Sequence, residues 1–101
     1  MKRLLIPLLA ALALPTAVNA NTWDDAMFKN SWPRFFDNFN NGVRFRDAED
    51  YQMTCESFIK ANNALTDNFA LFQRYKPSMD FFKYRRQLKA IVEDCNASSI
   101  Y

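Results

Sequence analysis

Two apolar stripes with helical spacing lie on either side of Pro77, and each contains one cysteine. Both stripes step by three or four residues, which is the period of an amphipathic helix. Cys55 lies 22 residues before Pro77 and Cys95 lies 18 residues after it. At a rise of about 1.5 Å per residue, an antiparallel hairpin turning at Pro77 brings the two thiols nearly level. The stripes consist of Tyr51, Cys55, Phe58, Asn62, Leu65, Phe69 and Phe72, and of Phe81, Tyr84, Leu88, Ile91 and Cys95.

These stripes predict an all-α fold, namely a small helical domain built on a disulfide-linked antiparallel helical hairpin with additional N-terminal helices. In a small exported chain, an even pair of cysteines indicates a disulfide. A loop of about 40 residues closed by such a bond contributes roughly 4 kcal/mol in the chain-entropy model. A redox-active or metal-binding pair is the alternative, although the spacing of Cys55 and Cys95 matches no CxxC motif.

The N-terminus has the three parts of a secretory signal. Two basic residues, Lys2 and Arg3, precede eleven apolar residues, and small or modest residues at 18–20 suit a cleavage site. The apolar run is shorter than the roughly 20 residues that span a bilayer. We therefore expect a cleavable signal peptide over 1–20, a single helical domain over 21–101, and a periplasmic or secreted location in which membrane association is not required.

Removal of Lys2 and Arg3 changes what the charge implies. The full chain has 13 Lys and Arg against 11 Asp and Glu, so residues 21–101 hold 11 of each. The net positive charge therefore belongs to the signal and is no argument for nucleic-acid binding. All sixteen aromatic residues remain in this segment, and large rings bury much area for the size of the core.

Local signals place helices before the hairpin. Thr22 suits the cap of a first helix, and Pro33 indicates a break or restart, since proline is tolerated only in a first helical turn. The segment Asn40–Gly42 is typical of a helix end, and 43–46 is expected to be a connection.

The hairpin helices have their own expected starts and ends. Asp47 is expected to cap a main helix over 48–75. This helix has a possible interruption at 66–68 and ends at Pro77. Ser78 is expected to cap the last helix.

The chemistry available to the chain is narrow because it contains no histidine. Histidine is the commonest general base and metal ligand, and no other catalytic motif is present. Carboxylates cluster where helix N-termini favour negative charge. We therefore expect no catalytic residue, no metal site and no cofactor, and we expect that the protein is not an enzyme.

Basic residues interleave with aromatic ones around the expected hairpin tip. Such a surface suits an anionic surface or an acidic partner, although a solvated helix face is the simpler interpretation. The candidate basic patch consists of Arg74, Lys76, Lys83, Arg85, Arg86 and Lys89.

Two short segments resemble a known family. The segments 53–59 (MTCESFI) and 91–95 (IVEDC) resemble the surroundings of the two cysteines in the small periplasmic acid-stress chaperones of the Hde type. The resemblance implies one disulfide between Cys55 and Cys95. It also implies a chaperone whose apolar surface is exposed in acid to bind unfolded clients, and a homodimer at neutral pH would fit this function. The residues that could form this surface are Phe35, Phe36, Phe39, Phe81 and Phe82.

A different function class also fits these residues. A constitutive envelope interaction module, such as an inhibitor, immunity or accessory protein, would use the aromatic segment or the basic tip to hold one protein partner at neutral pH.

Overall fold

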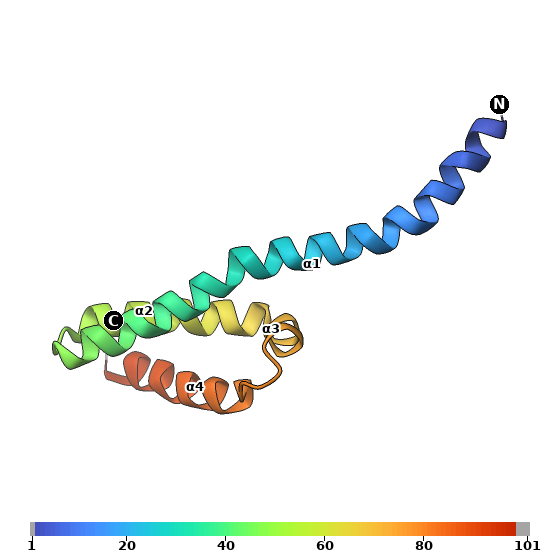
Figure 1. The fold of residues 1–101 in the computed structure, drawn as a ribbon. Coiled ribbons are helices and arrows are strands. Elements are labelled where there is room, and N and C mark those ends of the chain that lie inside the picture. The colour runs from blue at the N-terminus through green and yellow to red at the C-terminus, as the bar shows by residue number, and fades with distance from the viewer. Residues whose placement is uncertain (1, 99–101) are drawn as a thin grey trace.

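The computed structural model describes the backbone of residues 2–98 and the side chains of residues 22–97. Its four helices are α1 (Lys2–Asp47), α2 (Tyr51–Asp67), α3 (Phe69–Tyr75) and α4 (Phe81–Ser98). No strand occurs among these residues. Figure 1 shows the last part of α1 beside α2, with α4 returning antiparallel to α2 and the first part of α1 extending beyond the other helices. The predicted all-α class is confirmed.

The disulfide-linked hairpin is also confirmed. Cys55 in α2 and Cys95 in α4 form a disulfide with their Cα atoms 5.9 Å apart. Both apolar stripes face the core, as the burial of most of their residues shows. Tyr51, at the start of the first stripe, is the exception and is 52% exposed. The central members of the core are Phe35, Phe58, Ala61, Ala64, Leu65, Phe72, Phe81 and Leu88.

The main helix of the hairpin is interrupted at Asn68, within the segment 66–68 where the sequence predicted a possible interruption. Asn68 separates α2 from α3 with φ −127° and ψ 26°, outside the helical region. Its buried amide donates a hydrogen bond of 2.8 Å to the carbonyl of Ala64. This side-chain bond competes with the backbone ladder, which is how Asn interrupts helices.

Two predicted caps are wrong by three and two residues. Asp50, not Asp47, begins α2, because its Oδ1 accepts a hydrogen bond from the Met53 N–H at 3.2 Å. Asp80, not Ser78, precedes α4 and accepts from the Lys83 N–H at 3.1 Å. In each case the carboxylate satisfies an N–H group of the first turn.

The predicted division of the N-terminal segment into short helices is wrong. One helix, α1, passes through Thr22 and through Pro33 without interruption. A proline inside a helix costs about 3 kcal/mol. Aromatic residues on both sides of Pro33 pack against the hairpin, and each buried ring contributes about 1.5–3 kcal/mol. Burial of Phe35, together with partial burial of Phe28, Trp32 and Phe39, therefore outweighs the penalty.

Gly42 does not end a helix either, and 43–46 is not a connection, because α1 continues to Asp47. A Cβ atom at Gly42 would lie 2.7 Å from the ring of Phe58. The glycine is therefore needed for close approach between α1 and α2 rather than for a turn. The actual link is 48–50, where Glu49 has a positive φ of 61°.

The predicted signal peptide over 1–20 lies outside the residues whose side chains are described. Among the described residues, no helix is both long and apolar enough to cross a membrane.

Candidate functional site

Aromatic rings form a large part of the contact between α1 and the hairpin, beside the close approach of Gly42 to Phe58 of α2. Phe35 of α1 lies 5.6 Å from Phe72 and 6.2 Å from Phe81, measured between ring centroids. Phe39, one turn later, lies 5.3 Å from Tyr84. Phe35 and Phe81 are each only 1% exposed. We call Phe35, Phe39, Phe72, Phe81 and Tyr84 the aromatic interface.

A row of stacked rings covers one edge of this interface. Phe28, Trp32 and Phe36 follow one another at four-residue spacing on α1, with neighbouring centroids 5.5 and 5.7 Å apart. Tyr75 of α3 stacks on Phe28 at 4.6 Å. The Lys76 ammonium lies 5.3 Å from the centroid of the Trp32 ring. This row remains partly exposed, since Phe36 retains 44% of its accessible surface.

Two carboxylates of α1 contact α3 at the edge of this row. Asp24 pairs with the Arg74 guanidinium at 2.7 Å, and the Tyr75 hydroxyl donates a hydrogen bond to the Asp25 carboxylate. That hydrogen bond, helped by desolvation and by the charges of both carboxylates, raises the pKa of Tyr75 from 10.0 to about 12, while Arg74 opposes the rise. The Asp24–Arg74 pair is largely exposed, so it contributes about 0–1 kcal/mol.

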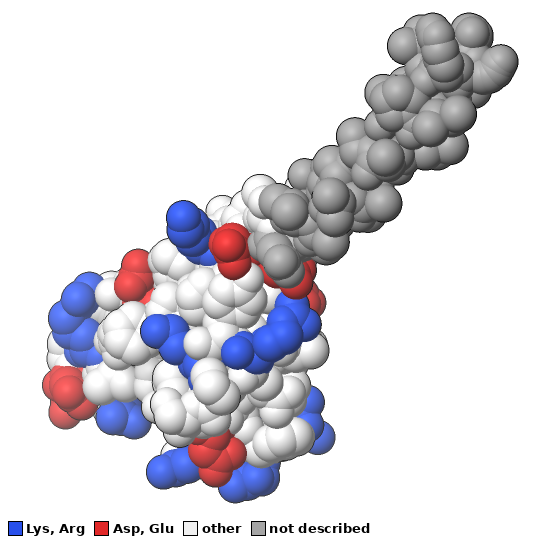
Figure 2. All heavy atoms as spheres, turned by 45° about the vertical axis from the view of Figure 1, so that its right-hand side comes forward, with Lys and Arg blue, Asp and Glu red and all other residues white. Residues whose placement is uncertain are grey.

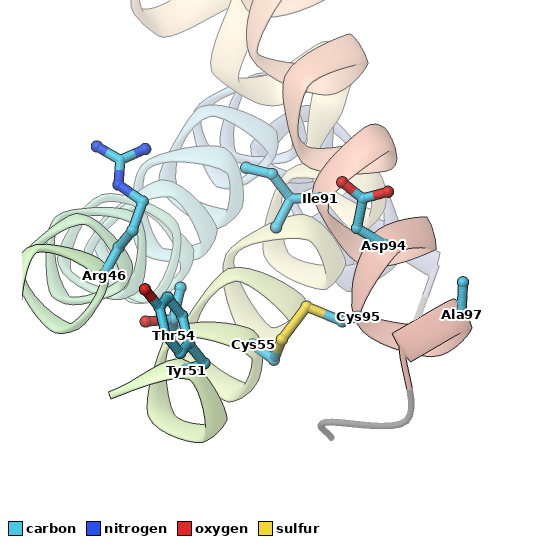
Figure 3. Close-up of a pocket in the computed structure, with 8 residues that line it drawn as sticks. All are labelled: Arg46, Tyr51, Thr54, Cys55, Ile91, Asp94, Cys95 and Ala97. Carbon is cyan, nitrogen blue, oxygen red and sulfur yellow. A yellow bond between two sulfur atoms is a disulfide. The ribbon is translucent and has the colours of Figure 1, made fainter. Parts of the chain in front are cut away.

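A second candidate site is an open groove of about 530 Å³ beside the disulfide. Figure 3 shows Cys55 and Tyr51 on one side, Cys95 on the other, and Ile91 between the helices. Arg46 comes from the end of α1, and Asp94 comes from α4 on the far wall. We call this the disulfide groove; it is lined by Arg46, Tyr51, Thr54, Cys55, Ile91, Asp94, Cys95 and Ala97.

The five phenylalanines predicted as an apolar binding surface do not form one surface in this structure. Phe35 and Phe81 are core, and Phe39 is half-buried in the aromatic interface. Phe36 and Phe82 are exposed, by 44% and 48%. Phe36 belongs to the row on α1, while Phe82 contacts Phe69 of α3 with centroids 5.1 Å apart.

The six predicted basic residues divide by partner. Arg74 is paired with Asp24, and Lys76 lies over Trp32. The four on α4, which are Lys83, Arg85, Arg86 and Lys89, are all exposed. Figure 2 shows basic side chains around one face of the molecule with acidic ones between them.

Two features of these sites were not predicted from the sequence. The Asp24 and Asp25 contacts join residues 50 positions apart, and nothing in the local pattern marks such a pairing. The disulfide groove has Arg46 as a wall because α1 extends past the predicted connection. Its other walls could have been found, since they flank the two cysteines on their stripes.

Among the described side chains, no three His, Cys, Asp or Glu residues converge in a way that could hold a metal ion.

Comparison with protein-family models, with curated proteins and with solved structures finds no match to this chain.

Proposed function

We propose that this chain is an exported, non-enzymatic chaperone that binds apolar segments of unfolded proteins when acid separates α1 from the hairpin. The observation that carries the proposal is the composition of the aromatic interface. Three of the five candidate client-binding rings, Phe35, Phe39 and Phe81, lie between α1 and the hairpin. Separation would therefore expose all three, in addition to Phe36 and Phe82, which are already exposed.

The covalent structure favours separation at this contact. The disulfide joins α2 to α4 and keeps the hairpin closed when packing weakens. No disulfide joins α1 to the other helices among the described residues; both cysteines are in the hairpin. Apart from its chain link to α2, α1 is held without covalent bonds, by ring packing, by its close approach to α2 at Gly42 and by the exposed contacts of Asp24 and Asp25.

Acid adds repulsion within the domain, because it neutralises carboxylates while every basic side chain keeps its charge. Residues 21–101 contain 11 basic and 11 acidic side chains, so their net charge would rise from about zero to about +11 near pH 3. The contacts of Asp24 and Asp25 are themselves weak, and self-repulsion over a small domain is therefore the main driving term.

The test uses the oxidised chain as recovered from expressing cells, with its N-terminus determined by mass spectrometry. We expect that lowering the pH from about 7 to about 3 increases binding of a dye specific for apolar surface. It should also suppress aggregation of an acid-denatured client and reduce any homodimer to monomers. A chain that stays folded, binds no dye and leaves client aggregation unchanged at the lower pH would refute the proposal.

A matched variant separates acid release from general unfolding. Phe36→Ser removes an exposed ring without opening the core, and Trp23→Ser removes an exposed ring that lies outside the candidate surface. Phe36→Ser should suppress client aggregation less than the parent chain does, whereas Trp23→Ser should suppress it as well as the parent. Dye binding should depend on pH in the same way in both variants.

A constitutive interaction module remains the second candidate, and the disulfide groove favours it. The groove is open and mostly apolar in the folded state, so a partner could bind there without acid. Ile91→Glu at the groove would abolish a stable complex formed at neutral pH, whereas Phe36→Ser would leave that complex intact.

A further inference from the structure

One face of α4 carries cations and an aromatic ring in a single stripe. Phe82, Arg85, Arg86 and Lys89 follow at three- and four-residue spacing, which places them on the same side of a helix. All four are exposed. We call these four residues the basic stripe; Lys83 lies on the neighbouring side, with Ser78 and Gln87.

Among side chains 22–97, no carboxylate forms an ion pair with a cation of the basic stripe. The ion pairs formed by side chains 22–97 are Arg46 with Asp47 and Arg74 with Asp24, and neither includes a member of the stripe. Asp80, the nearest carboxylate before the stripe, accepts a hydrogen bond at the start of α4. The positive charge of this face is therefore available to an external anion.

Aromatic rings support the centre of the stripe. The Arg85 guanidinium carbon lies 4.2 Å from the centroid of Phe69 and 5.1 Å from that of Phe82. Phe82 keeps 48% of its surface exposed. A guanidinium over a ring loses little of its hydrogen-bonding capacity at its edge. Charge and exposed apolar area thus coincide on one convex helix face.

We propose that the basic stripe binds the surface of an anionic phospholipid membrane. Long basic side chains on a convex helix suit an array of mobile phosphates, and an exposed aromatic ring among them suits the headgroup level of a bilayer. An acidic protein would need a complementary concave surface, which a single helix face does not specify. The inference does not depend on acid release, since every member of the stripe is already exposed in the folded state.

The experiment measures sedimentation of the oxidised chain with vesicles at neutral pH. We expect binding to vesicles rich in phosphatidylglycerol at about 50 mM salt and its loss at about 0.5 M salt, where charges are screened over a few ångströms. Replacement of Arg86 and Lys89 together by Gln should weaken binding roughly 25-fold, since each basic residue near an anionic surface contributes about a fivefold factor.

The matched control replaces Arg34 and Lys60 by Gln. These residues are also one Arg and one Lys, both exposed, but they border a different depression between α1 and α2. Vesicle binding of this control variant should change less than about twofold. Both variants have the same N-terminal segment, so this segment cannot account for a difference between them. Circular dichroism checks that both variants are folded.

Three results would overturn the assignment. Equal loss in the stripe and control variants would show that net charge alone is responsible. Equal binding of phosphatidylcholine vesicles would show that apolar contact elsewhere dominates. Stripe-dependent binding of soluble polyglutamate without vesicle binding would assign the face to an acidic protein instead.

Discussion

Glu49 holds an unusual backbone conformation at the end of α1. Its φ is 61°, in the left-handed region that glycine usually occupies. The Asp50 N–H donates to the Phe45 carbonyl and the Glu49 N–H to the Arg46 carbonyl, both at 2.9 Å. This is the Schellman arrangement that terminates helices, here formed without glycine.

Replacement of Glu49 by Gly should therefore stabilise the protein. A non-glycine residue in the left-handed region destabilises the folded state by about 1–2 kcal/mol. Glycine removes this strain, but it also gives the unfolded chain more conformational freedom, which offsets part of the gain. We expect the free energy of unfolding, measured by urea denaturation, to rise by about 0.5–1 kcal/mol. Glu49→Ala is the control, since it removes the same carboxylate but keeps the strain; equal stability of the two variants would contradict this account.

Gly42 has the opposite role, because its missing side chain makes room for a neighbour. An added Cβ would approach three ring atoms of the buried Phe58 to within 2.7–2.8 Å. Gly42→Ala should destabilise the fold by about 1–2 kcal/mol, since overpacking costs about 1–3 kcal/mol and alanine returns up to about 1 kcal/mol of helix propensity.

A double-mutant cycle tests the cause of that loss. In a Phe58→Leu background the smaller side chain can move away, so Gly42→Ala should cost less there than in the parent chain. An equal cost in both backgrounds would show that the ring of Phe58 is not what excludes a side chain at position 42.

At the scale of elements, the contact of α1 with α3 combines stacked rings with two polar links. Phe28 stacks on Tyr75, whose hydroxyl is bonded to Asp25 one turn earlier on α1. The apolar contact fixes where the helices meet, and the carboxylates fix the position of α1 along α3. This contact therefore responds to pH through the Tyr75 hydroxyl.

The raised pKa of Tyr75 predicts a loss of stability in alkali. The pKa in the folded state is about 12, above its ordinary value of 10.0. The contribution of this hydroxyl is therefore complete below about pH 10 and is lost as the pH rises toward 12. We expect the melting temperature of the parent chain to fall more steeply between these values than that of Tyr75→Phe.

Asp25→Ala should show the same shallower dependence, because it removes both the hydrogen-bond acceptor and the charge that raise the pKa of Tyr75. If Tyr75→Phe and the parent lose stability in parallel over this range, the hydrogen bond contributes nothing to the contact of α1 with α3.

At the scale of the whole molecule, the fold is stabilised by one covalent bond, the disulfide within the hairpin, and by the noncovalent contact of α1 with that hairpin. The disulfide joins two cysteines that are 40 residues apart in the chain, whereas α1 packs on this hairpin through noncovalent contacts. A small domain has a free energy of unfolding of only about 5–15 kcal/mol. Either contribution is therefore large relative to the total.

Replacement of both cysteines by Ser should lower the free energy of unfolding by roughly 4 kcal/mol, because the closed loop of about 40 residues no longer restricts the unfolded chain. Urea denaturation at neutral pH measures this loss, and reduction of the parent chain should reproduce it. A loss below about 1 kcal/mol would show that packing alone keeps the hairpin closed.

The sequence alone determined that the protein is helical, where the hairpin turns and which cysteines meet. These properties follow from short-range periodicity and from the number of residues on each side of Pro77. The buried positions of Phe58, Leu65, Phe72 and Leu88 follow from the same stripes.

Only the tertiary structure decided that α1 is one helix, which phenylalanines are core, and that Asp24 and Asp25 meet α3. Local signals at Pro33 and Gly42 predict breaks because they record penalties of about 3 and 1 kcal/mol for a helix in isolation. Those penalties are exceeded once Phe35 is buried against the hairpin, at about 1.5–3 kcal/mol for a fully buried ring, and Phe28, Trp32 and Phe39 are partly buried beside it. That burial joins residues far apart in the chain, so no local pattern contains it.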